Sequence, residues 1–500
     1  MASSYSLDRT TLLSRPVRVA AELLRQDETA LLHLFEDAHV LIRLEQAYCD
    51  RPDAWETFLF TVNQVIRFCP NVAVCVPAGS TGILAAAHVI AARVHGRRHA
   101  VRPVEFRHAD NYSAVVNIGS EILEGLPSVT VNSTGWVSRV ATAGSGATRL
   151  PRTPSTRNPI GALGAACLGT AHAFLFLVGQ PRATPPMEIS LFTLDASRSP
   201  TLPEGPRLPS RPVELDGLLV GCGAVANGWA YTVKRLPITG RIDAIDRQAL
   251  RIENIAPYVA ASQEWLGRPK AAMIASLLGP TITVTPRAED WELFKLRLSY
   301  GLRMPSLVVN GLDNVETRHS VQRLWPGVLV DMAAGGLTSQ VIVKPKRGNG
   351  ICLLRALDRP PHEVGWADRA AQHTGLHIER ILEAPTTPIT EADVAEAPTD
   401  KRATLERARQ QGRLVCGRVT EQSLLFEPRN TDFSPAVPFA TGFSGVVAAA
   451  ATMKWLMGYQ ADTGFHFQHS FATGRSRRIK MLCDSDCECQ VANSDSGTSA

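Results

Sequence analysis

The sequence lacks the compositional bias that marks a nucleic-acid-binding chain. Charged residues make up 20% of its 500 residues, and the formal net charge is only +5. So small an excess gives no electrostatic reason to expect nucleic acid as a partner. A short basic stretch, residues 475–480, is more typical of a solvated face than of a binding patch. We therefore expect no nucleic-acid partner.

The sequence also lacks a secretory signal and a long apolar run. Residues 1–30 carry scattered charges and no continuous apolar core. Residues 445–458 are shorter than the roughly 20 residues that span a bilayer, and residues 158–179 are rich in Gly and Ala. Both segments are predicted to be buried core helices, so no membrane partner is expected. The ten cysteines are spread along the chain, which suits reduced thiols and a cytoplasmic location.

Beyond these absences, the chain is organised as two similar halves. Its length exceeds the size at which a single hydrophobic core stops growing, so two domains are expected. Four apolar elements recur in the same order, which indicates an internal duplication of an α/β unit. The matched pairs are 71–94 with 218–236, 113–120 with 306–314, 128–140 with 327–343, and 158–179 with 445–458.

The boundaries follow from composition. Residues 1–180 are predicted to form the first domain, and about 16–65 are expected to form helices packed on it, because Leu31, Val40 and Leu44 fall at helical spacing. Residues 181–214 are rich in Pro and are predicted to be an extended linker. Residues 215–490 form the second domain, and 491–500 are expected to be a disordered tail.

The two halves differ where phosphate chemistry would be expected. The segment LLVGCGAVANGWA (218–230) has Gly221 and Gly223 between an apolar strand and a helix, which is typical of a phosphate-binding turn. At the matched place the first half has Pro77 and Gly79, and proline removes an amide donor. Where the second half has Asp313, the first has Gly119 or Ser120. The first half is therefore predicted to be a degenerate, structural partner.

A glycine turn alone fits NAD as well as ATP, so the residues after it decide between them. Asp243 or Asp246 ends the next strand, and Asn254 and Lys270 follow. A ribose-binding carboxylate followed by an amide and a cation favours a triphosphate over a nicotinamide. Asp313, after another apolar strand, lies where Mg²⁺ and phosphates bind in open sheets.

Together these motifs resemble the ubiquitin-activating enzymes and the related ThiF and MoeB sulfur-carrier adenylyltransferases. The motifs are G-x-G-A, D-x₇-N, G-x-P-K-A, L-D-N-x₃-R and V-D-x₃-G-G, beginning at Gly221, Asp246, Gly267, Leu312 and Val330. The resemblance covers about 215–490 well and 71–180 as a faded copy. It implies two tandem Rossmann-like adenylation folds that form an internal pseudo-dimer. The chain looks most like the activating component of bacterial ubiquitin-like conjugation operons that act against phage.

The resemblance also implies roles for individual residues. Gly221 and Gly223 would admit the ATP phosphates, Asp246 would hold the ribose, and Asp313 would bind Mg²⁺. Asn254 and Lys270 would contact the phosphates. One position departs from the family, because Pro257 stands where an arginine is usual, and Arg247 or Arg251 is a possible substitute.

Conjugating members of this group carry their cargo as a thioester on a cysteine. Cys416, within the expected catalytic-cysteine region at about 350–435, is the preferred candidate, and Cys352 is the alternative. The usual zinc site of relatives has two pairs of cysteines. Here Cys483, Cys487 and Cys489 lie near the C-terminus, and with Cys352 they could complete a four-thiolate zinc site.

The preferred hypothesis is an activating enzyme that adenylates a ubiquitin-like protein, binds it through Cys416 and transfers it to a conjugating enzyme. The alternatives are a sulfur-carrier adenylyltransferase, an NAD-dependent oxidoreductase and a non-catalytic scaffold of two inactive folds. The second copy and a long insertion at about 358–412 favour conjugation.

Overall fold

We describe the protein from a computed structural model. The residues that it describes are 9–96, 101–107, 111–299, 305–346, 352–357, 371, 374–377, 379–380, 388–410, 435–459, 464–479, 483 and 487–489. The chain divides into two compact units. The larger comprises residues 34–357 and 436–500, and the smaller comprises 1–33 and 358–435.

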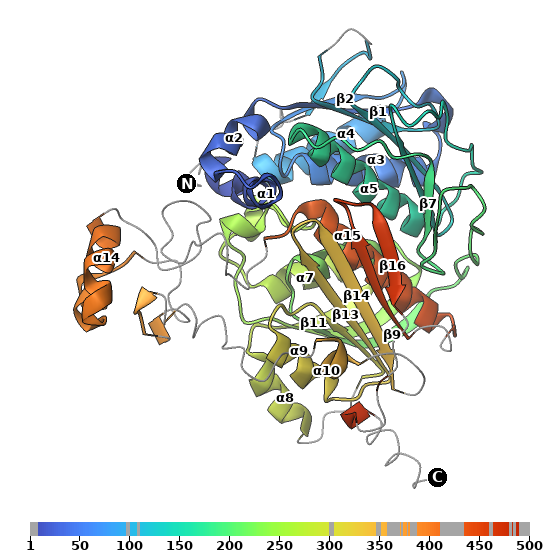
Figure 1. Ribbon diagram of the computed structural model, residues 1–500. Helices are drawn as coiled ribbons and strands as arrows, with labels where there is room; N and C mark the ends of the chain where they lie inside the picture. The colour runs from blue at the N-terminus through green and yellow to red at the C-terminus, as the bar shows by residue number, and fades with distance from the viewer. Residues whose placement is uncertain are drawn as a thin grey trace, which may run out of the picture. The chain divides into compact units, whose positions relative to one another are not determined.

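The larger unit contains two eight-stranded sheets (Figure 1). The first contains β1 (His39–Leu44), β2 (Asn71–Cys75), β3 (Val101–Pro103), β4 (Ala114–Ile118), β5 (Ser128–Thr134), β6 (Val137–Thr142), β7 (Met187–Ser190) and β8 (Ala196–Ser197). The second contains β9 (Val213–Val220), β10 (Ile238–Ile245), β11 (Ile282–Arg287), β12 (Leu307–Asn310), β13 (Val328–Gly335), β14 (Thr338–Pro345), β15 (Phe465–Ser470) and β16 (Arg475–Ile479).

The two sheets have the same topology. Their orders are β3-β2-β1-β4-β5-β6-β7-β8 and β11-β10-β9-β12-β13-β14-β15-β16. In each, the first five strands of the order are parallel and the last three are antiparallel. The predicted duplication of an α/β fold into an internal pseudo-dimer is therefore confirmed.

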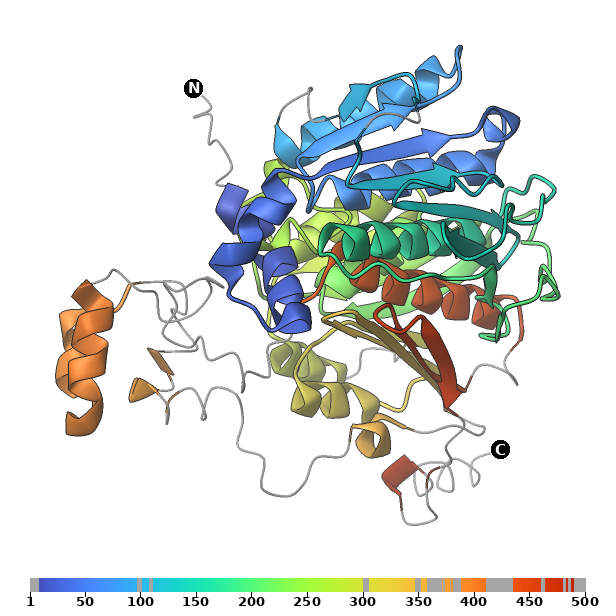
Figure 2. The same cartoon turned by 45° about the horizontal axis from the view of Figure 1, so that its top comes forward.

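Helices cover both sheets and fill the space between the copies. In the first copy these are α3 (Pro52–Val65), α4 (Thr81–His95) and α5 (Pro159–Leu177). In the second they are α6 (Ala224–Val233), α7 (Lys270–Leu278), α8 (Trp291–Ser299), α9 (Val315–Gln322), α10 (Leu353–Ala356) and α15 (Pro438–Leu456). Figure 2 shows α5 and α15 side by side between the two sheets, and both helices are almost entirely buried.

Small residues let these helices approach closely. A Cβ atom on Gly445 of α15 would lie 2.3 Å from the backbone carbon of Gly228 on α6. Across the copies, the rings of Phe60 and Tyr231 stack with centroids 4.6 Å apart. Among the described helices, α5 is long and apolar enough to cross a membrane, but 94% of it is buried inside the fold. It is a core helix of the first copy, as the sequence predicted.

Three sequence-based expectations about the first copy are wrong. Residues 39–44, expected to be helical, form β1 at the centre of the first sheet. Because β1 is nearly all buried, its apolar residues do not alternate with polar ones, and the run resembles part of a buried helix. The counterpart of β9 is therefore β1, and the predicted match between 71–94 and 218–236 is wrong. Nor are residues 181–214 simply a linker, since they contain β7 and β8.

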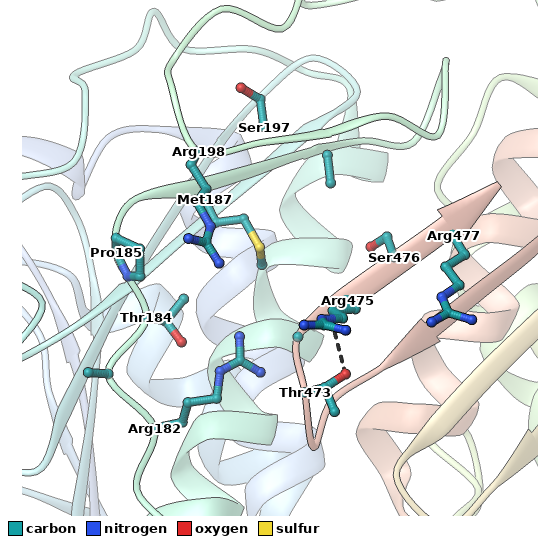
Figure 3. Close-up of a pocket in the computed structure, with 13 residues that line it drawn as sticks. Arg182, Thr184, Pro185, Met187, Ser197, Arg198, Thr473, Arg475, Ser476 and Arg477 are labelled. Atoms are coloured by element: carbon teal, nitrogen blue, oxygen red, sulfur yellow. Dashed lines mark hydrogen bonds between the residues drawn. The ribbon is translucent and has the colours of Figure 1, made fainter.

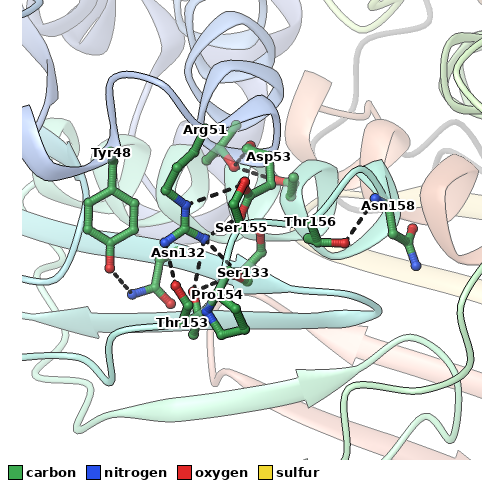
Figure 4. A network of polar contacts seen from close by, with 12 residues as sticks. Tyr48, Arg51, Asp53, Asn132, Ser133, Thr153, Pro154, Ser155, Thr156 and Asn158 are labelled. Atoms are coloured by element: carbon green, nitrogen blue, oxygen red, sulfur yellow. Dashed lines mark hydrogen bonds and ion pairs between the residues drawn. The ribbon is translucent and has the colours of Figure 1, made fainter.

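Polar contacts with Arg51 fix the connection between β6 and α5 (Figure 4). Arg51 pairs with Asp53 and donates hydrogen bonds to the backbone carbonyls of Thr153 and Pro154, at 2.7 and 3.1 Å. The corresponding connection of the second copy, residues 346–437, is much longer and contains the expected cysteine region. Most of that region lies outside the described residues.

Four helices lie wholly or partly in the described residues of the smaller unit. They are α1 (Arg9–Leu24), α13 (Glu391–Glu396), α14 (Thr399–Gln410) and the first residues of α2 (Glu28–Glu36). Leu376, Ile389, Leu405 and Ala408 form a small apolar core. Thr390 caps α13, and Arg380 pairs with Asp393 at 2.8 Å.

Candidate functional site

The glycine turn lies where the sequence predicted it, between β9 and α6. Gly221 has a φ of +79°, a conformation that favours glycine. A Cβ atom there would lie 2.9 Å from a methyl carbon of Leu312 and 3.0 Å from the carbonyl carbon of Gly311. Gly311 follows β12, so two strand ends meet at this turn without side chains between them. Sequence reasoning missed Gly311, because its role depends on Gly221.

The carboxylate of Asp246 is fixed beside this turn. Its Oδ2 accepts a hydrogen bond from the backbone N–H of Cys222 at 2.9 Å, and its Oδ1 accepts one from the N–H of Gln248 at 2.8 Å. The second of the two candidate acidic residues is thus the one at the turn. Asp243 instead pairs with Arg287 at 3.0 Å.

Lys270 is buried at the start of α7 and points back to the same loop. Its Nζ donates a hydrogen bond to Oε1 of Gln248 at 2.6 Å and lies 5.4 Å from the ring centre of Tyr258. A Cβ atom on Gly223 would be 3.8 Å from the hydroxyl of Tyr258. Asp246, Gln248, Lys270 and Tyr258 therefore form a continuous arc of contacts around the turn. Neither Gln248 nor Tyr258 was predicted from the sequence.

These residues fit a triphosphate. Gly223 is the N-cap of α6, and no described side chain caps this helix end, so its first N–H groups have no side-chain acceptor. Uncapped N–H groups at a helix N-terminus bind phosphate well. Burial, together with the Asp246 charge, raises the pKa of the Cys222 thiol well above its usual value, so this cysteine stays protonated.

Asn254 lies in the same loop but is used locally. It is buried, and its Oδ1 accepts a hydrogen bond from the backbone N–H of Arg251 at 3.0 Å. The carbonyl of Pro257 accepts a hydrogen bond from Thr441 at 2.7 Å. Arg247 forms an exposed pair with Asp290 at 3.2 Å, and Arg251 is exposed. The described contacts therefore do not show a replacement for the arginine that Pro257 displaces.

Asp313 is exposed just after β12, at the same edge of the sheet as the glycine turn. Behind it, Asp331 of β13 is fully buried and accepts hydrogen bonds from Asn310 at 2.7 Å and from Arg318 Nε at 3.1 Å. Because Asp331 pairs with Arg318, that arginine supports the strand ends rather than facing a ligand.

In the first copy, the equivalent place is filled by a side chain. Glu45 follows β1 directly, and its Oε1 accepts hydrogen bonds from the backbone N–H groups of Ser120 and Glu121 at 2.8 and 2.7 Å. A third comes from Asn117 Nδ2 at 2.8 Å. A Cβ atom on Gly119 would lie 2.0 Å from the Glu45 carboxyl carbon. Glu45, rather than Pro77, therefore distinguishes the first turn from the second.

The first copy also supports the loop of the second. Arg67, near the end of α3, is fully buried and donates hydrogen bonds to the carbonyls of Ile255, Val259 and Ala261. Burial lowers the pKa of Arg67 to about 9, which still leaves it charged at neutral pH. Asn63 adds a hydrogen bond to Val259 at 2.8 Å.

The four cysteines suggested as metal ligands lie together. The sulfur atoms of Cys352, Cys483, Cys487 and Cys489 are all within 4.8 Å of one another. Cys352 precedes α10, and the other three come from the C-terminal segment. Four convergent thiols are the ligand set of a structural zinc site. Cys416 lies outside the described residues.

Comparison with known proteins identifies the fold family. Residues 213–491, more than half of the chain, match the model of the ThiF family. The chain belongs to the ThiF family. The matched residues include the whole second copy with its glycine turn.

Individual similarities of this ThiF-family chain are distant. The uncharacterized protein y4jF of Sinorhizobium fredii (strain NBRC 101917 / NGR234) is 28% identical over 160 residues, which are 30% of this chain and 28% of the relative. E. coli MccB with MccA-N7isoASN has a TM-score of 0.35 at 11% identity, covering 55% of this chain and 67% of that one. PaaA gives 0.32 at 13% identity, covering 54% and 65%. The microcin C7 biosynthetic enzyme MccB with N-formylated MccA gives 0.36 at 9% identity, covering 72% and 97%.

Proposed function

We propose that this protein activates a ubiquitin-like protein by adenylating its C-terminal glycine. The observation that supports this is the arc of Asp246, Gln248, Lys270 and Tyr258 around the Gly221–Gly223 turn. It provides backbone N–H groups, one carboxylate and one buried cation at a single strand edge, which suits a nucleoside triphosphate.

In this proposal each residue has a role set by its position. The N–H groups at the start of α6 and the Lys270 ammonium bind phosphate oxygens, and Asp246 holds the ribose. Lys270 exchanges its bond to Gln248 for the ligand. Asn254 keeps the loop closed and reaches the phosphates only if its bond to Arg251 opens. The carboxylate of the terminal glycine attacks the α-phosphorus, and pyrophosphate leaves.

Asp313 is the proposed ligand of Mg²⁺, a hard cation that prefers carboxylate oxygens and phosphate. The ion would neutralise charge on the leaving pyrophosphate. Asp313 suits this role because it is exposed at the strand edge, unlike Asp331, whose carboxylate is already used by Arg318 and Asn310.

Cys416 is the proposed thioester nucleophile, and transfer to a conjugating enzyme would follow. Support comes from the alternative, Cys352, which is fully buried with its Sγ 3.5 Å from that of Cys487. Its burial and its place among the four clustered sulfur atoms leave Cys352 inaccessible to the C-terminus of a protein. We also propose that the four-cysteine cluster binds zinc and that the protein acts in the cytoplasm in bacterial antiviral defence.

A sulfur-carrier adenylyltransferase remains the second candidate, since it needs the same ATP site. Fusion of two copies and the long β14–α15 connection favour conjugation. A scaffold of two inactive folds is less consistent with the structure, because Glu45 fills the first site while the second keeps its glycines.

The experiment is ATP–pyrophosphate exchange with a candidate ubiquitin-like protein, using wild type, Asp313→Ala and Cys416→Ala. Exchange should vanish in Asp313→Ala and survive in Cys416→Ala. Both variants should lack the thiol-sensitive adduct that wild type shows on a non-reducing gel, because the thioester forms from the adenylate. An adduct lost in Cys352→Ala instead would reassign the nucleophile. No exchange with any ubiquitin-like or sulfur-carrier protein would support the scaffold.

A further inference from the structure

A pocket lies where the two copies meet, at the far edge of both sheets. The α5–β7 connection and β8 of the first copy face the β15–β16 turn of the second across a cavity of about 450 Å³ (Figure 3). In the second sheet, β16 is at the edge opposite to β11, whereas the glycine turn follows the central strand β9. The pocket is therefore separate from the proposed ATP site.

Its lining is strongly basic. Four arginines contribute to it, namely Arg182, Arg198, Arg475 and Arg477, and none of the other described lining residues is acidic. Within the described part of the chain, none of the four pairs with a carboxylate at ion-pair distance. Burial and the charges of Arg198 and Arg475 lower the pKa of Arg182. Positive charges gathered without a counter-ion repel one another, so an anion would stabilise this arrangement.

Arg182 is held with a hydrogen-bond donor unused. Its Nη1 is buried and has no hydrogen-bond partner among the described residues. The guanidinium lies against Gly474, where a Cβ atom would be only 1.9 Å from Nη2. Gly474 has a φ of +61° at the tip of the β15–β16 turn. The glycine turn thus leaves room for the Arg182 guanidinium. Because buried hydrogen-bond donors normally have acceptors, the unused Nη1 donor indicates that a ligand accepts from it.

At the pseudo-symmetric place on the other side, the described residues contact one another directly. There the first copy's β7–β8 turn meets the end of α15, and the Phe192 ring lies 5.2 Å from that of Tyr459, edge to face. Lys454 Nζ donates a hydrogen bond to the Phe192 carbonyl at 2.7 Å, and Arg478 donates to the Thr193 carbonyl at 3.2 Å. The described residues at this place contribute an aromatic pair and hydrogen bonds to backbone carbonyls, whereas the pocket gathers four arginines. The two places therefore differ in chemistry, and the arginines indicate what the pocket holds.

We propose that this pocket binds a small phosphorylated molecule carrying two or more phosphate groups. Planar guanidinium groups donate paired hydrogen bonds to phosphate oxygens, and the cavity has the size of a small-molecule site. Such a ligand would join Arg182 and Arg198 of the first copy to Arg475 and Arg477 of the second. The ligand is either free polyphosphate or the phosphate chain of a nucleotide.

The test measures binding of inorganic tripolyphosphate by isothermal titration calorimetry. Lys270→Ala weakens the proposed ATP site and should leave a tripolyphosphate site intact. In that background, Arg182→Gln/Arg475→Gln should weaken binding at least tenfold. Arg102→Gln, which removes one exposed charge on the edge strand β3, should not weaken it. Tripolyphosphate should also raise the melting temperature of the Lys270→Ala protein but not that of the triple variant.

Equal affinity in the Lys270→Ala protein with and without the arginine substitutions would overturn the proposal. Loss of all tripolyphosphate binding in the Lys270→Ala protein would also overturn it. Tighter binding of an oligoglutamate than of tripolyphosphate would overturn it as well and would indicate an acidic peptide as the ligand. Competition by ATP in the Lys270→Ala background would identify a nucleotide, and its absence would identify free polyphosphate. Because ATP–pyrophosphate exchange is not the readout, failure here is distinguishable from failure of the proposed adenylation.

Discussion

The guanidinium of Arg67 donates a hydrogen bond from Nη2 to the carbonyl of Val259 at 3.0 Å, so the first copy holds a loop of the second. That loop, which also contains Tyr258, adjoins the glycine turn. The first copy therefore contributes to the candidate site through a neighbouring backbone rather than through a group aimed at a ligand.

We expect Arg67→Ala to lower the free energy of unfolding by about 2–4 kcal/mol, because the buried carbonyls of Ile255 and Ala261 lose the arginine donor and that of Val259 keeps only Asn63. Urea unfolding followed by circular dichroism measures this. Arg241→Gln is the control, since Arg241 forms an exposed pair with Asp216 and its loss should have no measurable effect. Equal stability of the two variants would contradict the role of Arg67.

Gly221→Ala should abolish ATP binding and destabilise the fold, because a Cβ atom would meet Leu312 and Gly311 in a backbone conformation that favours glycine. Gly79→Ala is matched, since Gly79 has a φ of +89° with nothing within 4 Å of its Cβ position. It should show only the conformational cost, about 1–2 kcal/mol, and unchanged ATP affinity. Similar ATP affinities of the Gly221→Ala and Gly79→Ala proteins would show that the close contacts of Gly221 with Leu312 and Gly311 do not matter for ATP binding.

Glu45→Ala should destabilise the first copy by about 1–3 kcal/mol, since two backbone N–H groups and Asn117 lose their acceptor. It should not create a second nucleotide site, because the first turn lacks glycines like Gly221 and Gly223. Equilibrium dialysis with labelled ATP reports the stoichiometry, which should be the same as in wild type. A doubled stoichiometry would show that Glu45 alone closes the first site.

The purified protein should contain zinc, and Cys487→Ser should lose it. Elemental analysis by mass spectrometry measures the metal, and thermal unfolding should show that a strong chelator lowers the melting temperature. Cys75→Ser is the control, because Cys75 ends β2 in the other copy. Zinc retained by Cys487→Ser at the wild-type level would mean that the metal is bound elsewhere.

Stability should fall as the pH falls below about 6.5. Burial, with the Arg182 charge second, lowers the pKa of both His172 and His469 from 6.5 to about 3. Above pH 6.5 both are neutral in the folded and unfolded chain. Between 6.5 and 3 only the unfolded chain binds their protons, so stability declines by about 1 kcal/mol per histidine from pH 6.5 to 5.5.

Urea unfolding at these two pH values checks this expectation. His172→Gln/His469→Gln should reduce the loss of stability between them, and His39→Gln, at an exposed position, should not. A pH dependence equal in the double variant and wild type would show that other groups cause it.

The duplication was predictable because apolar strands and the two Ala-rich helices recur in order. The correct pairing of strands was not, since β1 is a six-residue buried run with the same apolar spacing as a helix. Asp246 and Lys270 were singled out because they follow the glycine turn at motif spacing, and the structure brings both beside that turn. Glu45 was missed because its acceptor role depends on N–H groups more than 70 residues away. The four cysteines of the cluster could be named from the sequence. That their sulfur atoms lie together depends on the path of the C-terminal segment back to α10, which the sequence does not show.

The carboxylate of Glu45 has a consequence for how such a protein can change. In a homodimer every substitution appears twice, so a side chain that closed one active site would close both. Two copies joined in one chain escape that symmetry, and a mutation in one half leaves its twin untouched. The first copy has Glu45 where the second has Gly221 and Gly223. The arginine-lined pocket and the contacts of Phe192 at the matched place are a second difference. Only a fused pair can keep such differences.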